Sequence, residues 1–116
     1  MREQLSPNFY RDEFACKCGC GLDTVDSALV VFMQASRDHF DRAHTISSGC
    51  RCPAHNRAEG GADNSQHLVC RAADYVVEGV TASLVQEFAE NYGIPGLGHY
   101  VRFTHADTRT EEIARW

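Results

Sequence analysis

The chain has 116 residues, which fits one compact domain and leaves little room for a second. Its 43% hydrophobic and 23% charged residues are ordinary for a globular protein. A chain of this length can bury a hydrophobic core without help from disulfides or a metal. A net charge of -5 excludes the broad basic surface of a nucleic-acid binder, so nucleic acid is not an expected partner.

The N-terminal residues carry no sign of a targeting or membrane segment. Residues 1–8 contain no apolar run and no small-residue cleavage site, so they do not resemble a secretory signal. The longest apolar run, Ala28–Met33, is far shorter than the ~20 residues that span a bilayer. We therefore expect a soluble monomer without membrane insertion, synthesised in the cytoplasm.

The first half of the chain is expected to contain one long helix. Turn-forming residues predict that residues 1–21 are an irregular lead-in. Asp23 or Thr24 can cap a helix that runs to about Ala43. Spacings of three, four and seven residues give this helix one apolar face, formed by Leu29, Phe32, Met33 and Phe40.

A strand and a long polar segment are expected to follow. His39 and His44 are placed in the last turns of the helix, where positive charge is favourable. Residues 45–48 favour a short strand. Residues 50–66 then form an unusually long connection, in which Pro53 can begin a short helix, and such connections often carry function.

The second half of the chain is predicted to form a strand over Ala72–Val77 and a helix over Thr81–Asn91. The residues of that helix expected to face inward are Leu84, Val85, Phe88 and Ala89. Glycines and a proline in residues 93–98 indicate a turn, and Tyr100–Thr108 alternates like a strand or hairpin before a tail at 110–116. This order of elements predicts a single α+β domain.

Two segments carry residues suited to a metal site. His67 lies at the end of the polar segment and Asp74 in the strand that follows, so both can reach one ion. His105 lies in another predicted strand and can complete the set. A catalytic zinc site uses three such ligands and leaves one position for water.

The local sequences resemble those of the zinc D-Ala-D-Ala carboxypeptidase family. Its motif S-x-H-x-x-G-x-A-x-D is matched by Ser65, His67, Ala72 and Asp74. The segment around Arg51 is similar to the family's S-x-x-R element, and the resemblance runs from about Leu5 to Arg109. The family includes L,D-endopeptidases and phage endolysins, and it shares its fold with the hedgehog signalling domain.

The resemblance implies a fold, a cofactor and a substrate. The fold is a central antiparallel sheet with helices on one side. The implied Zn²⁺ ligands are His67, Asp74 and His105, and Arg51 steadies the substrate carbonyl or carboxylate. Ser65 and Arg109, close to these ligands, are expected to contact the substrate. The implied activity is hydrolysis of peptide bonds in peptidoglycan stem peptides, by a phage-type enzyme that acts on the cell wall after release.

Cys70 replaces the glycine of the family motif. A glycine there suggests a backbone with positive φ or close packing, which a cysteine adopts at a steric cost. Cys70 is interpreted as a small side chain beside the site, with a thiolate ligand or a redox-sensitive thiol as alternatives.

The general base is also missing from its usual place. Many family members place an acidic residue three positions before the last histidine ligand, where this chain has Arg102. Asp107 is the first candidate to replace it, since it shares a strand face with His105, although it can instead orient that ligand. His99 and Glu59 are the other candidates.

The remaining cysteines leave three interpretations open. The chain has six cysteines, at positions 16, 18, 20, 50, 52 and 70. Reduced, partly buried thiols are favoured, because the spacing C-x-C-x-C differs from that of zinc ribbons. A structural metal site and disulfides formed after release are the alternatives.

The acidic residue missing at position 102 also leaves an alternative function open. The chain can instead be an inactive, zinc-holding binding module of the same fold.

Overall fold

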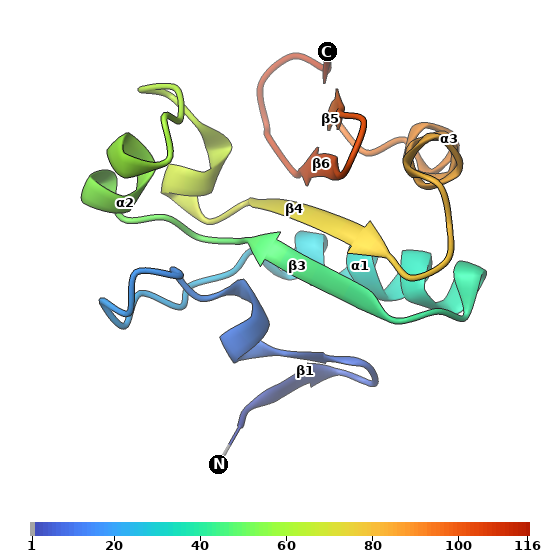
Figure 1. Cartoon of the computed structure of the whole chain (residues 1–116), viewed down its shortest axis with the longest axis horizontal. Coiled ribbons are helices and arrows are strands. Elements are labelled where there is room, and N and C mark those ends of the chain that lie inside the picture. Colours follow the sequence, from blue (N-terminus) through green and yellow to red (C-terminus); the bar gives the residue numbers. More distant parts are fainter. Residues whose placement is uncertain (1) are drawn as a thin grey trace.

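A five-stranded sheet forms the centre of the molecule (Figure 1). The computed structural model describes residues 2–116 and gives the strand order β3-β4-β6-β5-β7. Neighbouring strands are antiparallel except for β7, which runs parallel to β5. The strands are β3 (His44–Ser48), β4 (Ala72–Val77), β5 (Gly96–His99), β6 (Thr104–Asp107) and β7 (Ala114–Arg115). The predicted α+β class with a central antiparallel sheet is confirmed.

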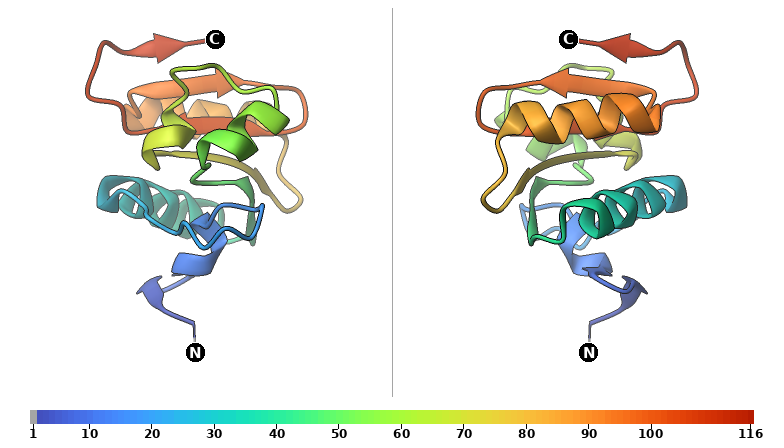
Figure 2. Two further views of the ribbon diagram at one scale, coloured as in Figure 1. Left: turned by 90° about the vertical axis from the view of Figure 1, so that its left-hand side faces the viewer. Right: turned by 90° about the vertical axis from the view of Figure 1, so that its right-hand side faces the viewer.

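The two long helices pack on one face of this sheet. They are α1 (Ser27–Phe40) and α3 (Ala82–Tyr92), and both contact β4. The short helices α2 (Pro53–Ala58) and η2 (Gln66–Val69) lie on the opposite side (Figure 2). We call the face under α1 and α3 the core face, and the opposite face the site face. None of the helices in the described residues is long and apolar enough to cross a membrane.

Alternation along β4 separates the two faces. Tyr75, Ala73 and Val77 belong to the hydrophobic core, whereas Asp74 points to the site face. The ring of Phe32 from α1 lies edge-on to Tyr75, with ring centroids 6.4 Å apart. The strand predicted over Ala72–Val77 therefore has the bounds that its sequence indicates, and its alternation places one carboxylate away from the core.

Both long helices differ in detail from their predictions. The first begins after Asp26 and ends at Phe40, because the left-handed φ of 51° at Asp41 stops it before Ala43. His44 is thus the first residue of β3 and not part of a helix turn. The side chain of Leu84 on α3 is predicted to face the core, but it is 52% exposed. It lies about 100° around the helix from buried Val85, on the side away from the sheet.

The expected irregular lead-in contains regular structure. A two-stranded ribbon of β1 (Gln4–Ser6) and β2 (Phe9–Tyr10) leads into the short helix η1 (Arg11–Phe14). Phe9 and Phe14 are almost fully buried in the core, which anchors this segment. The lead-in is irregular only beyond η1, up to the start of α1.

The predicted turn at residues 93–98 is a turn only up to residue 95, because strand β5 begins at Gly96. Leu97 is fully buried on the core face, which favours strand despite the flanking glycines. The glycines face the other way: a Cβ on Gly96 would overlap the Asp107 carboxylate, and one on Gly98 would come within 2.8 Å of the Trp116 indole. Close packing on the site face therefore explains a composition that resembles a turn.

Candidate metal centre

His67, on η2, is fixed on the site face by hydrogen bonds from its backbone N–H and from its ring. The hydroxyl of Ser65 caps this helix and accepts a hydrogen bond from the His67 N–H at 3.2 Å. The ring Nδ1–H donates to the carbonyl of Gly49 at 2.6 Å. This bond leaves Nε2 as the unprotonated nitrogen, 3.2 Å from Asp74 Oδ1. The buried ring therefore presents a metal-binding nitrogen to the carboxylate.

Sheet register brings the other two ligands together. Asp74 on β4 and His105 on β6 are direct cross-strand partners, and His105 Nδ1 lies 2.9 Å from Asp74 Oδ1. All three predicted ligands are buried, and their donor atoms lie within 4.8 Å of one another. Two imidazoles and one carboxylate are a donor set typical of zinc, so the residues present fit this ion.

The electrostatics of the group favour a cation. Burial acts to raise the pKa of Asp74, but hydrogen bonds from His105 and His67 lower it to about 2. Burial likewise acts to lower the pKa of His105, but hydrogen bonds to Asp107 and Asp74 raise it. The carboxylates are thus ionised and their surroundings stabilise positive charge.

Asp107 contacts the far side of the His105 ring. Its Oδ2 lies 2.7 Å from His105 Nε2, and the fully buried carboxylate also accepts two hydrogen bonds from the Arg109 guanidinium, each 2.8 Å long. Burial acts to raise the pKa of Asp107, yet the bonds from Arg109 and His105 hold it well below its usual range. Both oxygens are therefore engaged: Oδ2 contacts His105 and Arg109, and Oδ1 accepts from Arg109.

Arg51 lies beside Asp74 at the start of the loop after β3. Its guanidinium donates to Ser48 Oγ at 2.9 Å and to Asn56 Oδ1 at 3.2 Å, and Nη2 lies 3.5 Å from Asp74 Oδ2. A guanidinium has five N–H donors, so two of them have no acceptor among residues 2–116. Arg51 is thus held rigidly with donors left for a ligand.

A cavity of about 660 Å³ opens above these residues. The ionisable side chains that line it are Arg51, Glu59, His67, Asp74, His105, Arg109 and Glu111. Ser65 also lines it, so the residues expected to contact a substrate share one cavity. His99 is not part of its lining, and its Nδ1 instead lies 2.8 Å from the carbonyl oxygen of Trp116.

Comparison with known families identifies the chain. The model of the peptidase M15 family matches residues 7–107, which include all three candidate ligands. The chain belongs to the peptidase M15 family. Comparison with curated proteins gave no match. Together with its buried His-Asp-His group, this membership makes the protein a metal-dependent peptidase and confirms the resemblance noted in its sequence.

Aromatic residues form a wall of the M15 site that the sequence analysis missed. The Trp116 indole lies 4.9 Å from the His105 ring, and its Nε1–H donates to the Tyr100 hydroxyl at 2.9 Å. Tyr100 in turn stacks on Phe103. Strand β7 therefore holds the end of the expected tail, residues 110–116, in the sheet. Ile113, just before this strand, is 70% exposed. Gly98 was the available signal, since a strand glycine often marks a close approach.

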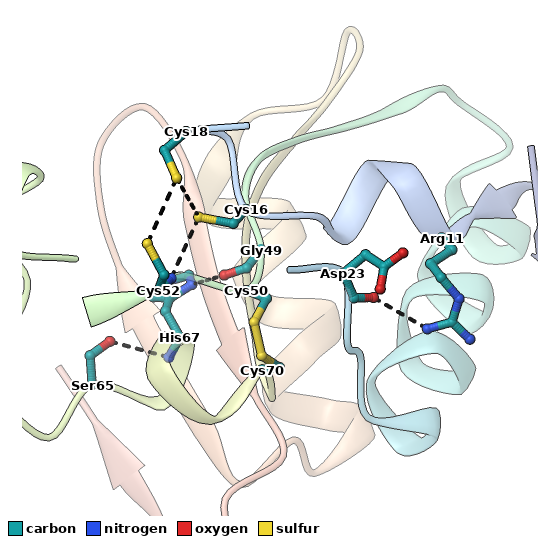
Figure 3. Close-up of a disulfide and its surroundings, with 10 residues drawn as sticks. All are labelled: Arg11, Cys16, Cys18, Asp23, Gly49, Cys50, Cys52, Ser65, His67 and Cys70. Carbon is teal, nitrogen blue, oxygen red and sulfur yellow. Dashed lines mark hydrogen bonds between the residues drawn. A yellow bond between two sulfur atoms is a disulfide. The ribbon is translucent and has the colours of Figure 1, made fainter. Parts of the chain in front are cut away.

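A disulfide joins Cys50 to Cys70 next to the metal ligands (Figure 3). The favoured interpretation of six reduced thiols is therefore wrong for this pair, and Cys70 is not available as a thiolate ligand. Cys70 ends η2 with a φ of 60°, the left-handed conformation that the family glycine indicates. The disulfide links the loop of Arg51 to the helix of His67.

Proposed function

We propose that this M15 peptidase uses Zn²⁺ to hydrolyse peptide bonds in peptidoglycan stem peptides. The observation that carries the proposal is the buried group of His67, Asp74 and His105 at the base of a cavity. These three residues would hold the ion. Zinc in such a site supplies a Lewis acid that activates water near neutral pH and polarises a carbonyl.

Arg51 binds the substrate in this proposal. Arg51 lines the cavity beside Asp74, and its two unpaired donors match a carbonyl or carboxylate oxygen of the peptide. Ser65 fixes η2, and Arg109 lines the same cavity while it holds Asp107. Two cationic side chains suit the anionic stem peptides of peptidoglycan.

Glu59 is the residue we assign to proton transfer. It lines the cavity with a side chain that is 55% exposed, so it can accept a proton from the attacking water and pass it to the leaving amine. Asp107 has both oxygens engaged and acts as a positioning residue for His105. His99 lies outside the cavity lining, which leaves it no contact with a substrate there.

The setting of the reaction is part of the same proposal. In this proposal the protein is a phage or prophage enzyme, and it acts as a monomer on the cell wall after release from the cytoplasm. The disulfide between Cys50 and Cys70 supports action in an oxidising compartment.

Digestion of purified sacculi and synthetic stem peptides by the zinc-loaded protein, followed by mass spectrometry, tests this function. We expect the wild type to release one alanine or a defined fragment, and His67→Ala to release nothing. Glu59→Gln should lose most of this activity, while Glu111→Gln, which changes another glutamate of the same cavity, should retain it. A wild type that binds zinc but cleaves no substrate would favour the binding module.

A further inference from the structure

A second group of potential metal ligands lies outside the peptidase site. The sulfur atoms of Cys16, Cys18, Cys20 and Cys52 all lie within 4.8 Å of one another. Figure 3 shows three of these residues, with Cys18 directed toward both Cys16 and Cys52. The group shares no residue with the His-Asp-His site, and the four cysteines are free thiols.

The spacing of these sulfurs matches a tetrahedral metal site. With zinc–sulfur bonds of about 2.3 Å, the edges of a zinc tetrathiolate are about 3.8 Å long. Cys18 Sγ lies 3.4 Å from Cys16 Sγ and 3.7 Å from Cys52 Sγ. Four sulfurs that are all mutually close surround one point, an arrangement that two separate disulfides do not require.

The local backbone holds the thiols in place. The chain between Cys16 and Leu22 closes on itself, because the Cys16 N–H donates to the Leu22 carbonyl at 2.8 Å. Gly19 and Gly21 have φ values of 82° and 92°, which let this loop turn tightly around Cys20. A residue with a side chain fits such a conformation poorly, so the glycines that flank Cys20 shape the loop.

Backbone N–H groups point at two of the sulfurs. The Cys52 N–H donates to Cys16 Sγ at 3.5 Å, and the His55 N–H donates to Cys52 Sγ at 3.4 Å, where Cys52 caps α2. Donors of this kind stabilise thiolates and orient them as ligands. Cysteines that only filled space would not need these bonds.

We propose that Cys16, Cys18, Cys20 and Cys52 bind a second zinc ion, which is structural. Four protein ligands close the coordination shell, so this site has no open position for catalysis. Thiolates are soft ligands, and a tetrahedral set of four selects zinc or iron. Zinc is the ion we assign, because four cysteine thiolates are a common ligand set of structural zinc sites.

The site connects two segments that are far apart in sequence. It ties the N-terminal loop to Cys52, which directly follows Arg51. The same junction is held by a backbone bond from the Cys50 N–H to the Phe14 carbonyl, and the Arg51 N–H next to it donates to the His67 carbonyl on η2. Zinc here would fix the backbone that presents Arg51 to the cavity and would protect four thiols from oxidation.

Metal content of the full-length protein, purified under reducing conditions with zinc and without chelators, tests the proposal. We expect two zinc ions per wild-type chain, one in His67→Ala and one in Cys18→Ser/Cys20→Ser. Cys20→His is the matched variant, because imidazole replaces a thiolate ligand, and it should keep both ions. A single zinc that disappears in His67→Ala, or iron in place of zinc at the cysteines, would overturn the proposal.

Cobalt substitution provides a test that needs no change at the cysteines. Co²⁺ bound by four thiolates gives intense visible absorption and a sulfur-to-cobalt charge-transfer band, whereas the His-Asp-His site has no sulfur ligand. Both features should appear in wild type and in His67→Ala. Their absence from both proteins would contradict the site even if the serine variant does not fold. Peptidase activity is not part of either readout, so failure of the proposed function leaves this result intact.

Discussion

Two buried histidines on opposite faces of the sheet have opposite electrostatics. His44 on β3 is 8% exposed and His105 on β6 is 7% exposed, so burial alone does not distinguish them. On the core face, His44 Nδ1–H donates to the Arg42 carbonyl at 2.9 Å, and Ser36 Oγ lies 2.8 Å from its Nε2. Burial is the main cause that lowers the pKa of His44.

On the site face, the ring of His105 lies between two carboxylates. Asp74 contacts one nitrogen and Asp107 the other, and together they raise the pKa of His105 against the effect of burial. The difference shows that the partners of a buried ring decide the direction in which its pKa shifts. The core face excludes positive charge, whereas the site face is built to stabilise it before any metal binds.

The largest expected effect is a loss of folding stability from a substitution on the core face, which should leave the site face unchanged. Phe32→Ala removes a fully buried ring that packs against Tyr75 and should lower the free energy of unfolding by about 3–5 kcal/mol. Zinc affinity of the folded protein should not change. Urea unfolding and competitive zinc titration measure both quantities, and Val31→Ala, at an exposed position of α1, is the control. A parallel loss of zinc affinity would show that the two faces are coupled.

On the site face, Arg51→Lys tests whether a fixed guanidinium stabilises the reaction. Lysine keeps the charge but cannot hold Ser48, Asn56 and a substrate oxygen together. We expect kcat/KM on a stem peptide to fall by about 10²–10³-fold, or roughly 3 kcal/mol. Arg57→Lys on the exposed side of α2 should leave it unchanged. Equal activity of both variants would contradict the role of Arg51.

The sequence predicts the site better than the elements around it. Strand β4 and the ligands His67 and Asp74 follow from local pattern, because alternation and a motif with fixed spacing are contained in adjacent residues. The left-handed backbone at Cys70 follows from the glycine that it replaces. What the local pattern does not contain is which strand lies beside which, so the direct pairing of Asp74 with His105 needs the fold.

The parts that were missed depend on contacts between distant residues. Strand β5 resembles a turn because it contains two glycines. Gly96 makes room for Asp107, 11 residues later, and Gly98 makes room for Trp116, 18 residues later. The disulfide between Cys50 and Cys70 has the same origin, since the spacing of cysteines does not specify their pairing. Composition therefore misleads where tertiary packing selects the residue.

A smaller effect is expected where the site face orients a ligand. Asp107→Asn keeps the shape of the side chain but removes the charge that faces His105 Nε2. We expect zinc affinity or kcat to fall by about 10–100-fold with little change in KM, because the substrate does not contact this buried group. Zinc competition and steady-state kinetics across pH provide the readout. A loss in KM alone would place Asp107 in contact with the substrate.

The smallest effect is the pH dependence that His44 gives to the core face. Its pKa in the folded protein lies below the value of about 6.5 expected in the unfolded chain. As the pH falls through about 6.5, the unfolded chain therefore binds a proton that the folded protein does not, and stability decreases. This single group contributes a slope of at most about 1.4 kcal/mol per pH unit.

His44→Gln isolates that contribution, since an amide keeps a donor and an acceptor near Arg42 and Ser36 but does not titrate. Urea unfolding of wild type and variant between about pH 5 and 7 should show a smaller loss of stability on acidification in the variant. Other titrating groups are present in both proteins, so their contributions cancel when the two slopes are subtracted. Equal slopes would mean that His44 accepts a proton inside the core, and the contrast with His105 would then rest on something other than its partners.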